Sequence, residues 1–263
     1  MVMKIRELLD YLEERVPLSQ QEEFDNSGVQ CGDTSQELRA VLVAIDTTEA
    51  VVDEAIAKGC NLIVTHHPAL FRGVKSITPD YYINRVVIKA IKHDIVLYAS
   101  HTSLDNDDEG VNIFWARKMG LQNVKILSPI EGNPNVGSGV IGDLPSPRSI
   151  DELVEQMKTF QPITHVAHSK PLADKVKRVA YCGGSGNFLM SVAIEKKADI
   201  FITGEAKYND YYDAEGEILL MTIGHYESEL LTKELLKEIM SEKKGNFAIY
   251  SAESCANPVH YIS

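Results

Sequence analysis

The same order of apolar segments occurs twice along the chain. In the first half, the segments 39–45, 61–65 and 95–100 predict strands, and the segments 50–58 and 82–92 between them predict helices. Strands that alternate with helices are typical of α/β folds, in which helices cover a largely parallel or mixed sheet. The first half is therefore expected to form one α/β unit.

The second half repeats this order. Adding 138 to the numbers of residues 41–65 places each predicted strand and helix on a counterpart. In this half, strands are predicted over 176–182, 199–203 and 218–223, and a helix is predicted over 188–197. Such a repeated order indicates internal duplication. We therefore expect an α/β protein with mixed sheets and two repeats, over 1–127 and 128–263, joined at about 127–147 by a connection rich in Gly, Pro, Ser and Asn.

The charge and the cysteines narrow the class of protein. The chain has 26 Lys and Arg against 38 Asp and Glu, a net charge of −12. That charge disfavours binding to nucleic-acid phosphates and to anionic membranes. The sequence has no apolar run that could span a membrane and no signal peptide. Its four cysteines are far apart and indicate neither a disulfide framework nor a zinc finger, so we expect a cytoplasmic protein.

Histidines and carboxylates follow three of the predicted strands. These residues are His66, His67, His101, Asp105, His225 and Glu229. Two of the three sets have the spacing His-x-x-x-carboxylate, which places both side chains on one face of a helix. Ligands of α/β sheets bind at the carboxyl ends of the strands. We therefore expect these side chains to form the functional site.

Each set taken alone also has an ordinary structural interpretation. His66 and His67 fit an exposed loop, and Asp105 and Glu229 fit helix caps beside a packed histidine. Taken together, three imidazoles and two carboxylates suit Zn, Fe(II), Mn, Co or Ni better than Mg or Ca. A carboxylate that bridges two ions about 3.5–4 Å apart is a common feature of two-metal sites.

Two further polar motifs also follow predicted strands. Gly183-Gly184-Ser185-Gly186 joins a strand to a helix and fits either a tight turn or a weak anion site. The segment from Thr203 to Tyr212 fits either a substrate contact or an ordinary loop.

These motifs resemble those of the GTP cyclohydrolase 1 type 2 homologue family, also called the NIF3-like or dinuclear metal-centre family. The resemblance extends from Lys4 to the C-terminus. The motifs that carry it are Asp25-Asn26-Ser27-Gly28, Thr65-His66-His67-Pro68, His101 to Asp105, Cys182 to Gly186, Thr203-Gly204-Glu205 and Gly224-His225 to Glu229. The resemblance implies two intertwined α/β repeats, a two-metal site between them and a ring-shaped homohexamer.

The resemblance also implies roles for individual residues. His101 matches a family histidine close to the metals, so it is the candidate catalytic acid or base. The family often has a histidine where this chain has Asn209, and the chain resembles the short form because it lacks the extra domain of long members. The implied metal ligands are His66, His67, Asp105, His225 and Glu229.

The function expected from these features is metal-dependent hydrolysis. Two divalent transition-metal ions per chain, Zn, Fe or Mn, would activate water for attack on a small substrate, with a nucleotide as one candidate. Opening of the GTP ring is suggested only by the family name. The alternative is a non-enzymatic metal-binding regulator or assembly scaffold. Nucleic-acid handling would require the basic residues Lys170, Lys175, Lys177 and Arg178 to cluster.

Overall fold

The computed structural model describes residues 3–261, which form two compact units. Unit 1 contains the chain up to residue 104 together with 232–256, and unit 2 contains 105–231 together with the chain from 257 onward. Each unit therefore takes segments from distant parts of the sequence, and the boundary expected near residue 127 lies within unit 2. Within 3–261, no helix has both the length and the apolar character that crossing a membrane requires.

Unit 1 is built on a five-stranded sheet of order β1-β4-β3-β2-β11. Its strands are β1 (Gly28–Cys31), β2 (Ala40–Ala44), β3 (Leu62–Thr65), β4 (Val96–Ala99) and β11 (Ala248–Ser251). All run parallel except β1, which pairs antiparallel with β4. Every residue of β2, β3 and β4 is buried, as expected for strands covered by helices on both faces.

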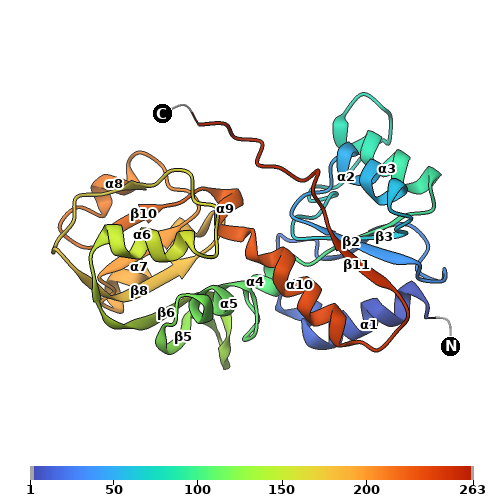
Figure 1. Ribbon diagram of the computed structural model, residues 1–263. Helices are drawn as coiled ribbons and strands as arrows, with labels where there is room; N and C mark the ends of the chain where they lie inside the picture. Colours follow the sequence, from blue (N-terminus) through green and yellow to red (C-terminus); the bar gives the residue numbers. More distant parts are fainter. Residues whose placement is uncertain (1–2, 262–263) are drawn as a thin grey trace. The chain divides into compact units, whose positions relative to one another are not determined.

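Four long helices cover the two faces of this sheet. They are α1 (Ile5–Arg15), α2 (Glu49–Ala57), α3 (Tyr82–Lys92) and α10 (Leu231–Glu242). Figure 1 shows α2 and α3 on one face and α1 and α10 on the other. The apolar face of α1 is fully buried, and α2 begins where the side chain of Thr48 accepts a hydrogen bond from the amide of Val51. The short elements η1 (Leu18–Gln20) and α4 (Thr102–Asp105) complete the unit, and the unit boundary lies inside α4.

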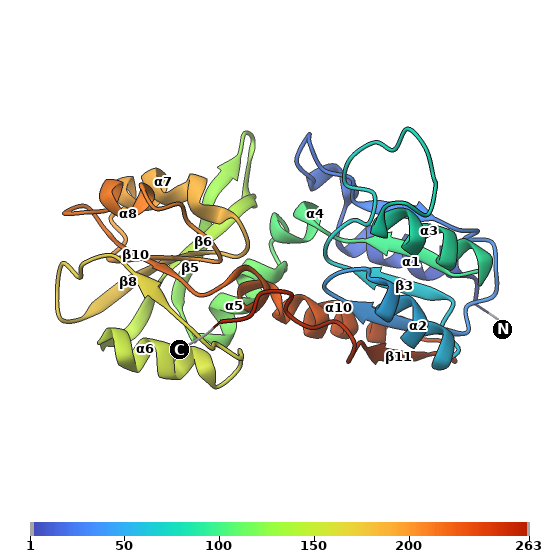
Figure 2. The same cartoon turned by 90° about the horizontal axis from the view of Figure 1, so that it is seen from above.

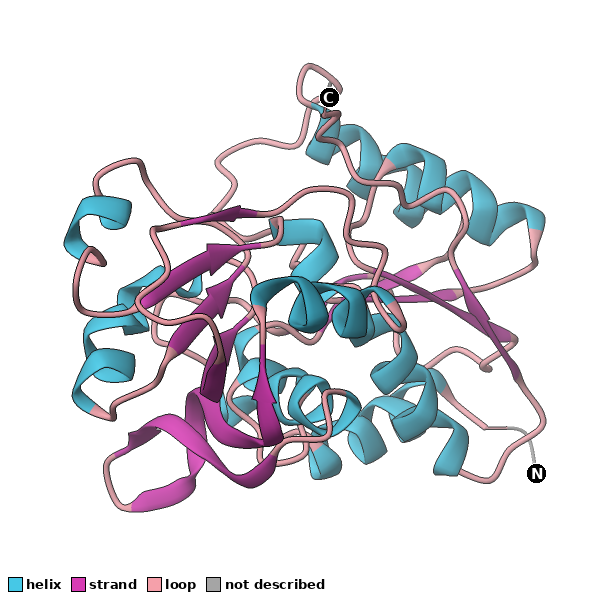
Figure 3. Ribbon diagram, turned by 60° about the vertical axis from the view of Figure 1, so that its left-hand side comes forward, coloured by secondary structure: helices cyan, strands magenta, loops and turns pink. Residues whose placement is uncertain are grey.

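Unit 2 is built on a six-stranded sheet of order β5-β6-β8-β9-β10-β7. Its strands are β5 (Gln122–Ile130), β6 (Asn133–Arg148), β7 (Ala167–His168), β8 (Val176–Cys182), β9 (Ile200–Thr203) and β10 (Leu219–Thr222). Its helices are α5 (Val111–Lys118), α6 (Ile150–Lys158), η2 (Gly186–Leu189), α7 (Met190–Glu195), α8 (Asp210–Asp213) and α9 (His225–Glu229). Helices α7 and α8 lie on one face of this sheet and α5 and α6 on the other (Figure 2), and Figure 3 shows the strands and helices by type.

The two sheets share a core of the same topology, which confirms the expected duplication. Strands β2-β3-β4 and β8-β9-β10 are both parallel, lie in the same order and end at a short antiparallel strand, β1 or β7. The register agrees as well: Val41 pairs with Leu62, and Val179 pairs with Ile200 at the offset of 138. The repeats differ at the other edge, where β2 is flanked by parallel β11 and β8 by antiparallel β6.

The structure differs from expectation over 127–147, which we expected to be a connection. These residues lie in the antiparallel hairpin of β5 and β6. The glycines that suggested a loop permit close strand packing: a Cβ on Gly137 would lie 2.2 Å from the carbonyl oxygen of Ser128, and one on Gly139 would lie 2.9 Å from that of Tyr181. Glycine in this segment therefore indicates tight pairing and not a flexible linker.

Candidate metal centre

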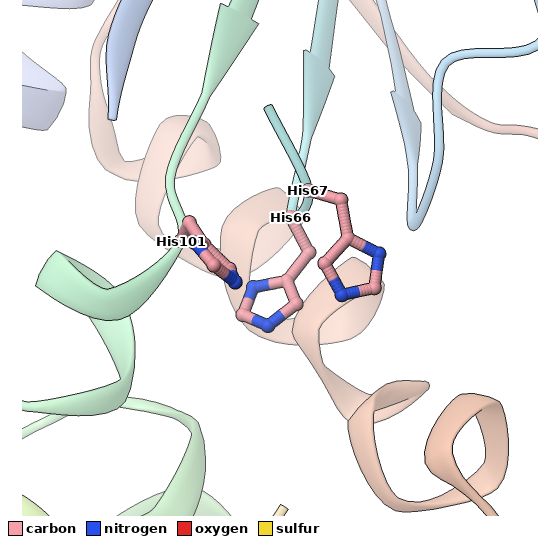
Figure 4. A group of neighbouring side chains, drawn as sticks. All are labelled: His66, His67 and His101. Atoms are coloured by element: carbon pink, nitrogen blue, oxygen red, sulfur yellow. The ribbon is translucent and has the colours of Figure 1, made fainter. Parts of the chain in front are cut away.

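In unit 1, strand β3 positions the two adjacent histidines. The parallel pairing with β2 continues beyond Thr65, because the amide of His66 donates to the carbonyl of Ala44 (3.3 Å) and that of His67 to the carbonyl of Ile45 (3.0 Å). The ring of His66 is fully buried, and its centroid is 5.0 Å from that of His67. The strand end therefore fixes both rings on the same side of the chain, as Figure 4 shows.

The third imidazole of unit 1 comes from the next strand. His101 follows β4, and its ring centroid lies 5.2 Å from that of His66 and 5.4 Å from that of His67. One ring nitrogen from each of the three histidines lies within 4.8 Å of the other two. The three rings converge in Figure 4. This spacing allows them to bind closely spaced ions, so His101 is placed as a potential ligand as well as a potential acid or base.

The Nδ1 atom of each of these rings donates to an oxygen acceptor. His66 donates to the carbonyl of Ser100 (3.1 Å), His67 to Oδ1 of Asp46 (2.8 Å) and His101 to Oδ1 of Asp25 (2.7 Å). A carbonyl or a carboxylate accepts here, so the hydrogen is on Nδ1, and in the neutral ring Nε2 then carries the lone pair. This arrangement is typical of metal-binding histidines, whose second nitrogen is held by such a partner.

Asp25 is the most strongly held of these partners. Burial alone would raise its pKa, but hydrogen bonds from His101 and from the hydroxyl of Thr102 outweigh burial and lower the pKa well below its usual range. The carboxylate also accepts from the amide of Thr102 (3.0 Å) and the hydroxyl of Ser27 (2.9 Å). Asp25 is therefore ionised at neutral pH and fixes the orientation of the His101 ring.

In unit 2, helix α9 places His225 and Glu229 on one face. Nε2 of His225 lies 3.1 Å from Oε2 of Glu229, while Nδ1 of the same ring donates to Glu205. With its hydrogen on Nδ1, the ring directs a lone pair at a carboxylate oxygen, which is unfavourable unless a proton or a cation lies between them. When two ligand atoms each lie about 2.0–2.2 Å from one ion and the ligand–ion–ligand angle is about a right angle, the two atoms are roughly 3 Å apart. The donor pair therefore fits a divalent metal ion.

The glycine-rich turn after β8 packs directly against this pair. A Cβ on Gly184 would lie 2.2 Å from Oε1 of Glu229 and 3.4 Å from Nε2 of His225, so only glycine leaves room for the ligands. The amides of the turn are engaged within the protein: that of Gly183 donates to Oδ1 of Asn112 (3.1 Å) and that of Gly184 to the hydroxyl of Ser228 (2.9 Å). The motif is thus the expected tight turn, and these two amides do not form an anion site.

Asp105 lies near the same part of unit 2. The side chain of Asn112 connects the two segments, since its amide donates to the carbonyl of Asp105 (3.0 Å) while its oxygen accepts from Gly183. Burial raises the pKa of the Cys182 thiol, and the nearby carboxylates of Asp105 and Glu229 raise it further. Cys182 is therefore a neutral thiol, and unit 2 gathers two carboxylates and one imidazole.

A buried aromatic stack supports α9 from the core of unit 2. Trp115 stacks on Tyr181 with ring centroids 3.8 Å apart, and the hydroxyl of Tyr181 donates to the carbonyl of Ser228 (2.5 Å). The indole of Trp115 donates to Gln161 (3.0 Å), whose amide donates to the carbonyl of Glu227 (3.1 Å). Burial raises the pKa of Tyr181 well above its usual value, so its hydroxyl stays protonated and can donate.

The structure thus groups the six expected residues by unit. Unit 1 brings together His66, His67 and His101, and unit 2 holds Asp105, His225 and Glu229. Three carboxylates that orient imidazoles were not expected from the sequence. Asp25 and Glu205 lay within motifs that we quoted, and Asp46 directly follows a predicted strand, so position at a strand end was the available signal. These carboxylates are Asp25, Asp46 and Glu205.

Known proteins resemble this chain in both sequence and structure. The model of the Duf34/NIF3 (NGG1p interacting factor 3) family matches residues 3–258. A Streptococcus pneumoniae protein named "GTP cyclohydrolase 1 type 2 homolog" is 32% identical over 248 residues, 91% of this chain and 92% of the relative. The Lactococcus lactis protein of the same name is 31% identical over 261 residues, 99% of this chain and 100% of the relative. The crystal structure of a Staphylococcus aureus hypothetical protein matches with a TM-score of 0.90 at 31% identity, covering 100% of both chains.

Proposed function

The chain belongs to the Duf34/NIF3 family, and we propose that it is a metal-dependent hydrolase that binds two divalent transition-metal ions per chain. The observation that carries the proposal is the orientation of four imidazoles. In each ring Nδ1 is held by an oxygen acceptor, the arrangement that orients metal-binding histidines in proteins. Nitrogen and carboxylate donors without cysteine suit Zn, Fe or Mn.

We further propose that the donors of both units bind the same pair of ions, as the family resemblance implies. Five protein donors shared by two ions leave coordination positions for water and substrate, whereas structural sites are usually closed by four ligands. The donors are His66, His67, Asp105, His225 and Glu229.

Bound ions would lower the pKa of water to near neutrality and polarise a substrate oxygen. His101 would then transfer the proton. Its Nδ1 is held by the ionised carboxylate of Asp25, so Nε2 can accept a proton and the carboxylate stabilises the resulting imidazolium. A positioned acid or base of this kind contributes about 10²–10⁴-fold to a rate.

Elemental analysis and a hydrolysis screen test the proposal. The purified chain should contain about two transition-metal ions, and hydrolysis of a nucleotide or phosphoester panel that includes GTP should require them. His66→Ala and Glu229→Ala should lose metal and turnover together. His101→Ala should keep its metal and lose about 10²–10⁴-fold in rate. Full metal occupancy in His66→Ala and Glu229→Ala would contradict the site.

The screen also distinguishes the alternative function. A non-enzymatic regulator or scaffold would bind the same ions but hydrolyse no member of the panel with Zn, Mn, Co or Fe(II). Metal binding without turnover would therefore contradict the hydrolase proposal and support a non-enzymatic regulator or scaffold.

Assembly and location are part of the same proposal. The family resemblance supports a homohexameric ring, which light scattering would detect as a mass of about 175 kDa, six times the 29.2 kDa chain. The cysteines Cys31, Cys60, Cys182 and Cys255 are all free, which supports a reducing cytoplasmic location.

A further inference from the structure

Two exposed phenylalanines lie beside the imidazoles of unit 1. The ring of Phe71 meets that of His101 edge to face, with centroids 5.9 Å apart and planes at 87°. Phe24 in turn meets Phe71 at 6.4 Å and 71°. Phe24 is 67% exposed and Phe71 is 42% exposed. This phenylalanine pair (Phe24 and Phe71) therefore extends the cluster of candidate ligands with an accessible apolar surface.

Hydrogen bonds hold the two loops that carry the phenylalanine pair. The side-chain amide of Asn26 donates to the carbonyl of Leu70 (2.7 Å), and the amide of Leu70 donates to Oε1 of Gln30 (3.1 Å). Asp25, next to Phe24, accepts from His101. The residues adjoining each phenylalanine are thus fixed to the other loop or to the candidate site. Burying a phenylalanine would stabilise the fold, yet both rings remain exposed on loops that hydrogen bonds hold in place.

Two cations follow Phe71 in the same loop. Arg72 and Lys75 belong to a stretch, 71–82, in which every residue is exposed. Within residues 3–261 neither cation has an ion-pair partner, although the chain as a whole carries a net charge of −12. A cationic loop in an acidic protein attracts anions locally. An aromatic ring beside candidate metal ligands, with two cations one and four residues further along the same exposed loop, suits a planar ring that carries an anionic group.

We propose that the phenylalanine pair binds the planar ring of a phosphorylated substrate, such as a nucleotide, and that Arg72 and Lys75 bind its phosphate. The inference rests on the proposed function, because it assigns a substrate class to the same site. Stacking of a base on an aromatic side chain tolerates different bases, since each presents a flat π-face. The phenylalanine pair would therefore select for a planar ring without specifying guanine.

Equilibrium binding to the metal-loaded, full-length protein tests the inference without requiring turnover. Calorimetry would compare purine and pyrimidine nucleoside monophosphates with ribose 5-phosphate, which lacks the ring, and with the nucleosides, which lack the phosphate. Phe24→Ala and Phe71→Ala should weaken nucleotide binding about 5- to 100-fold and leave ribose 5-phosphate unchanged. Arg72→Ala and Lys75→Ala should weaken nucleotide and ribose 5-phosphate alike.

The chain offers matched controls. Phe71→Trp, which keeps an aromatic ring at this position, should bind nucleotide about as tightly as the wild type, unlike Phe71→Ala. Tyr250→Ala, which removes a ring of similar exposure (39%) from β11 in the same unit, should leave it unchanged. All variants should keep their metal content and the mass of the assembly. Nucleotide binding with this pattern but without hydrolysis would support the inference while removing the hydrolase proposal.

Three results would overturn the inference. The first is the absence of nucleotide binding to the wild-type protein. The second is equal nucleotide affinity with and without the phenylalanine pair. The third is dissociation of the assembly or loss of metal in Phe24→Ala and Phe71→Ala, because the rings would then serve packing and not recognition.

Discussion

At the scale of single residues, each candidate metal-binding imidazole depends on one acceptor for its orientation. Asp46 illustrates the point, because its carboxylate accepts from Nδ1 of His67 at 2.8 Å. Without that acceptor the ring can rotate or hold its hydrogen on Nε2, and in either state it binds metal poorly.

Asp46→Asn is therefore expected to lower metal affinity about 10- to 100-fold while the fold is retained. Competition with a chelator would measure the change. Asp53→Asn is the matched control, because Asp53 pairs with Lys89 (2.9 Å) at the surface of the same unit and, within residues 3–261, pairs with no imidazole. Equal metal affinity in Asp46→Asn and the wild type would refute the orienting role.

Gly184 offers a second test at this scale. Gly184→Ala would place a methyl group 2.2 Å from Oε1 of Glu229, and because that oxygen ends a side chain, the carboxylate would move before the backbone does. We expect at least about 10-fold weaker metal binding. Gly216→Ala is the control: it has the same left-handed backbone (φ +79° against +59°) but open space around its Cβ, so it should cost about 1 kcal/mol of stability without changing metal affinity.

The candidate ligands were predictable from the sequence, but most of their hydrogen-bond partners were not. His66 and His101 follow β3 and β4, two adjacent parallel strands whose carboxyl ends lie at one edge of a sheet, so their grouping follows from topology. Asp46 is one of 38 acidic residues in the chain, and no local pattern distinguishes it from a helix cap. Its role depends on which loops meet, and that requires the fold.

At the scale of elements, the regular strands and helices were predictable and the closing strands were not. The predicted helix over 82–92 coincides with α3, and the predicted strand over 176–182 coincides with β8. Strand β11 is four residues long and alternates between exposed and half-buried residues, so it lacks the apolar run that revealed the central strands. The hairpin of β5 and β6 was not predicted, because glycines in this segment suggest loops.

Helix α2 is joined to the segment after β11 through Glu54. Its carboxylate accepts from Lys58 (2.6 Å) and from the amides of Glu253 (3.0 Å) and Ser254 (2.8 Å), and its side chain is only 11% exposed. Burial raises the pKa of Glu54, but these hydrogen bonds outweigh burial and lower it to about 2. The depressed pKa means that the carboxylate stabilises the fold at neutral pH.

The sign of the pH dependence follows from that shift. The stabilisation is complete above the unfolded pKa, about 4.5, and is lost as the pH falls towards about 2. Glu54→Gln should thus lower the free energy of unfolding by about 1–2 kcal/mol at pH 7, and the difference from the wild type should shrink between pH 4.5 and 2. Urea titrations across this range would measure it. A constant difference at every pH would contradict the assignment.

At the scale of the whole molecule, the repeats are not independent segments of chain. Unit 1 needs α10 and β11, which come from the far end of the sequence. Helix α10 buries four large apolar side chains in this unit, worth about 6–12 kcal/mol together. That amount is comparable with the entire stability of a typical domain, about 5–15 kcal/mol. The buried side chains are those of Leu235, Leu236, Ile239 and Met240.

A fragment of residues 1–127 is accordingly expected to lack a cooperative thermal transition, although it contains most of unit 1. A fragment that joins 1–104 to 232–256 through a short linker should unfold cooperatively, because it contains every element of the unit. Circular dichroism melting of the two fragments makes the comparison. Cooperative unfolding of 1–127 would show that α10 and β11 are dispensable.

The late position of β11 also determines when unit 1 can finish folding during synthesis. Strand β2 ends at residue 44, but the strand that covers its edge begins at residue 248. At about 5–20 residues per second, the ribosome needs roughly 10–40 s to make the residues between them. Throughout that interval the nascent chain presents an apolar strand with an unpaired edge, the feature that most readily recruits another chain. The rate of translation between residues 44 and 248 therefore sets how long this strand edge stays uncovered on the ribosome.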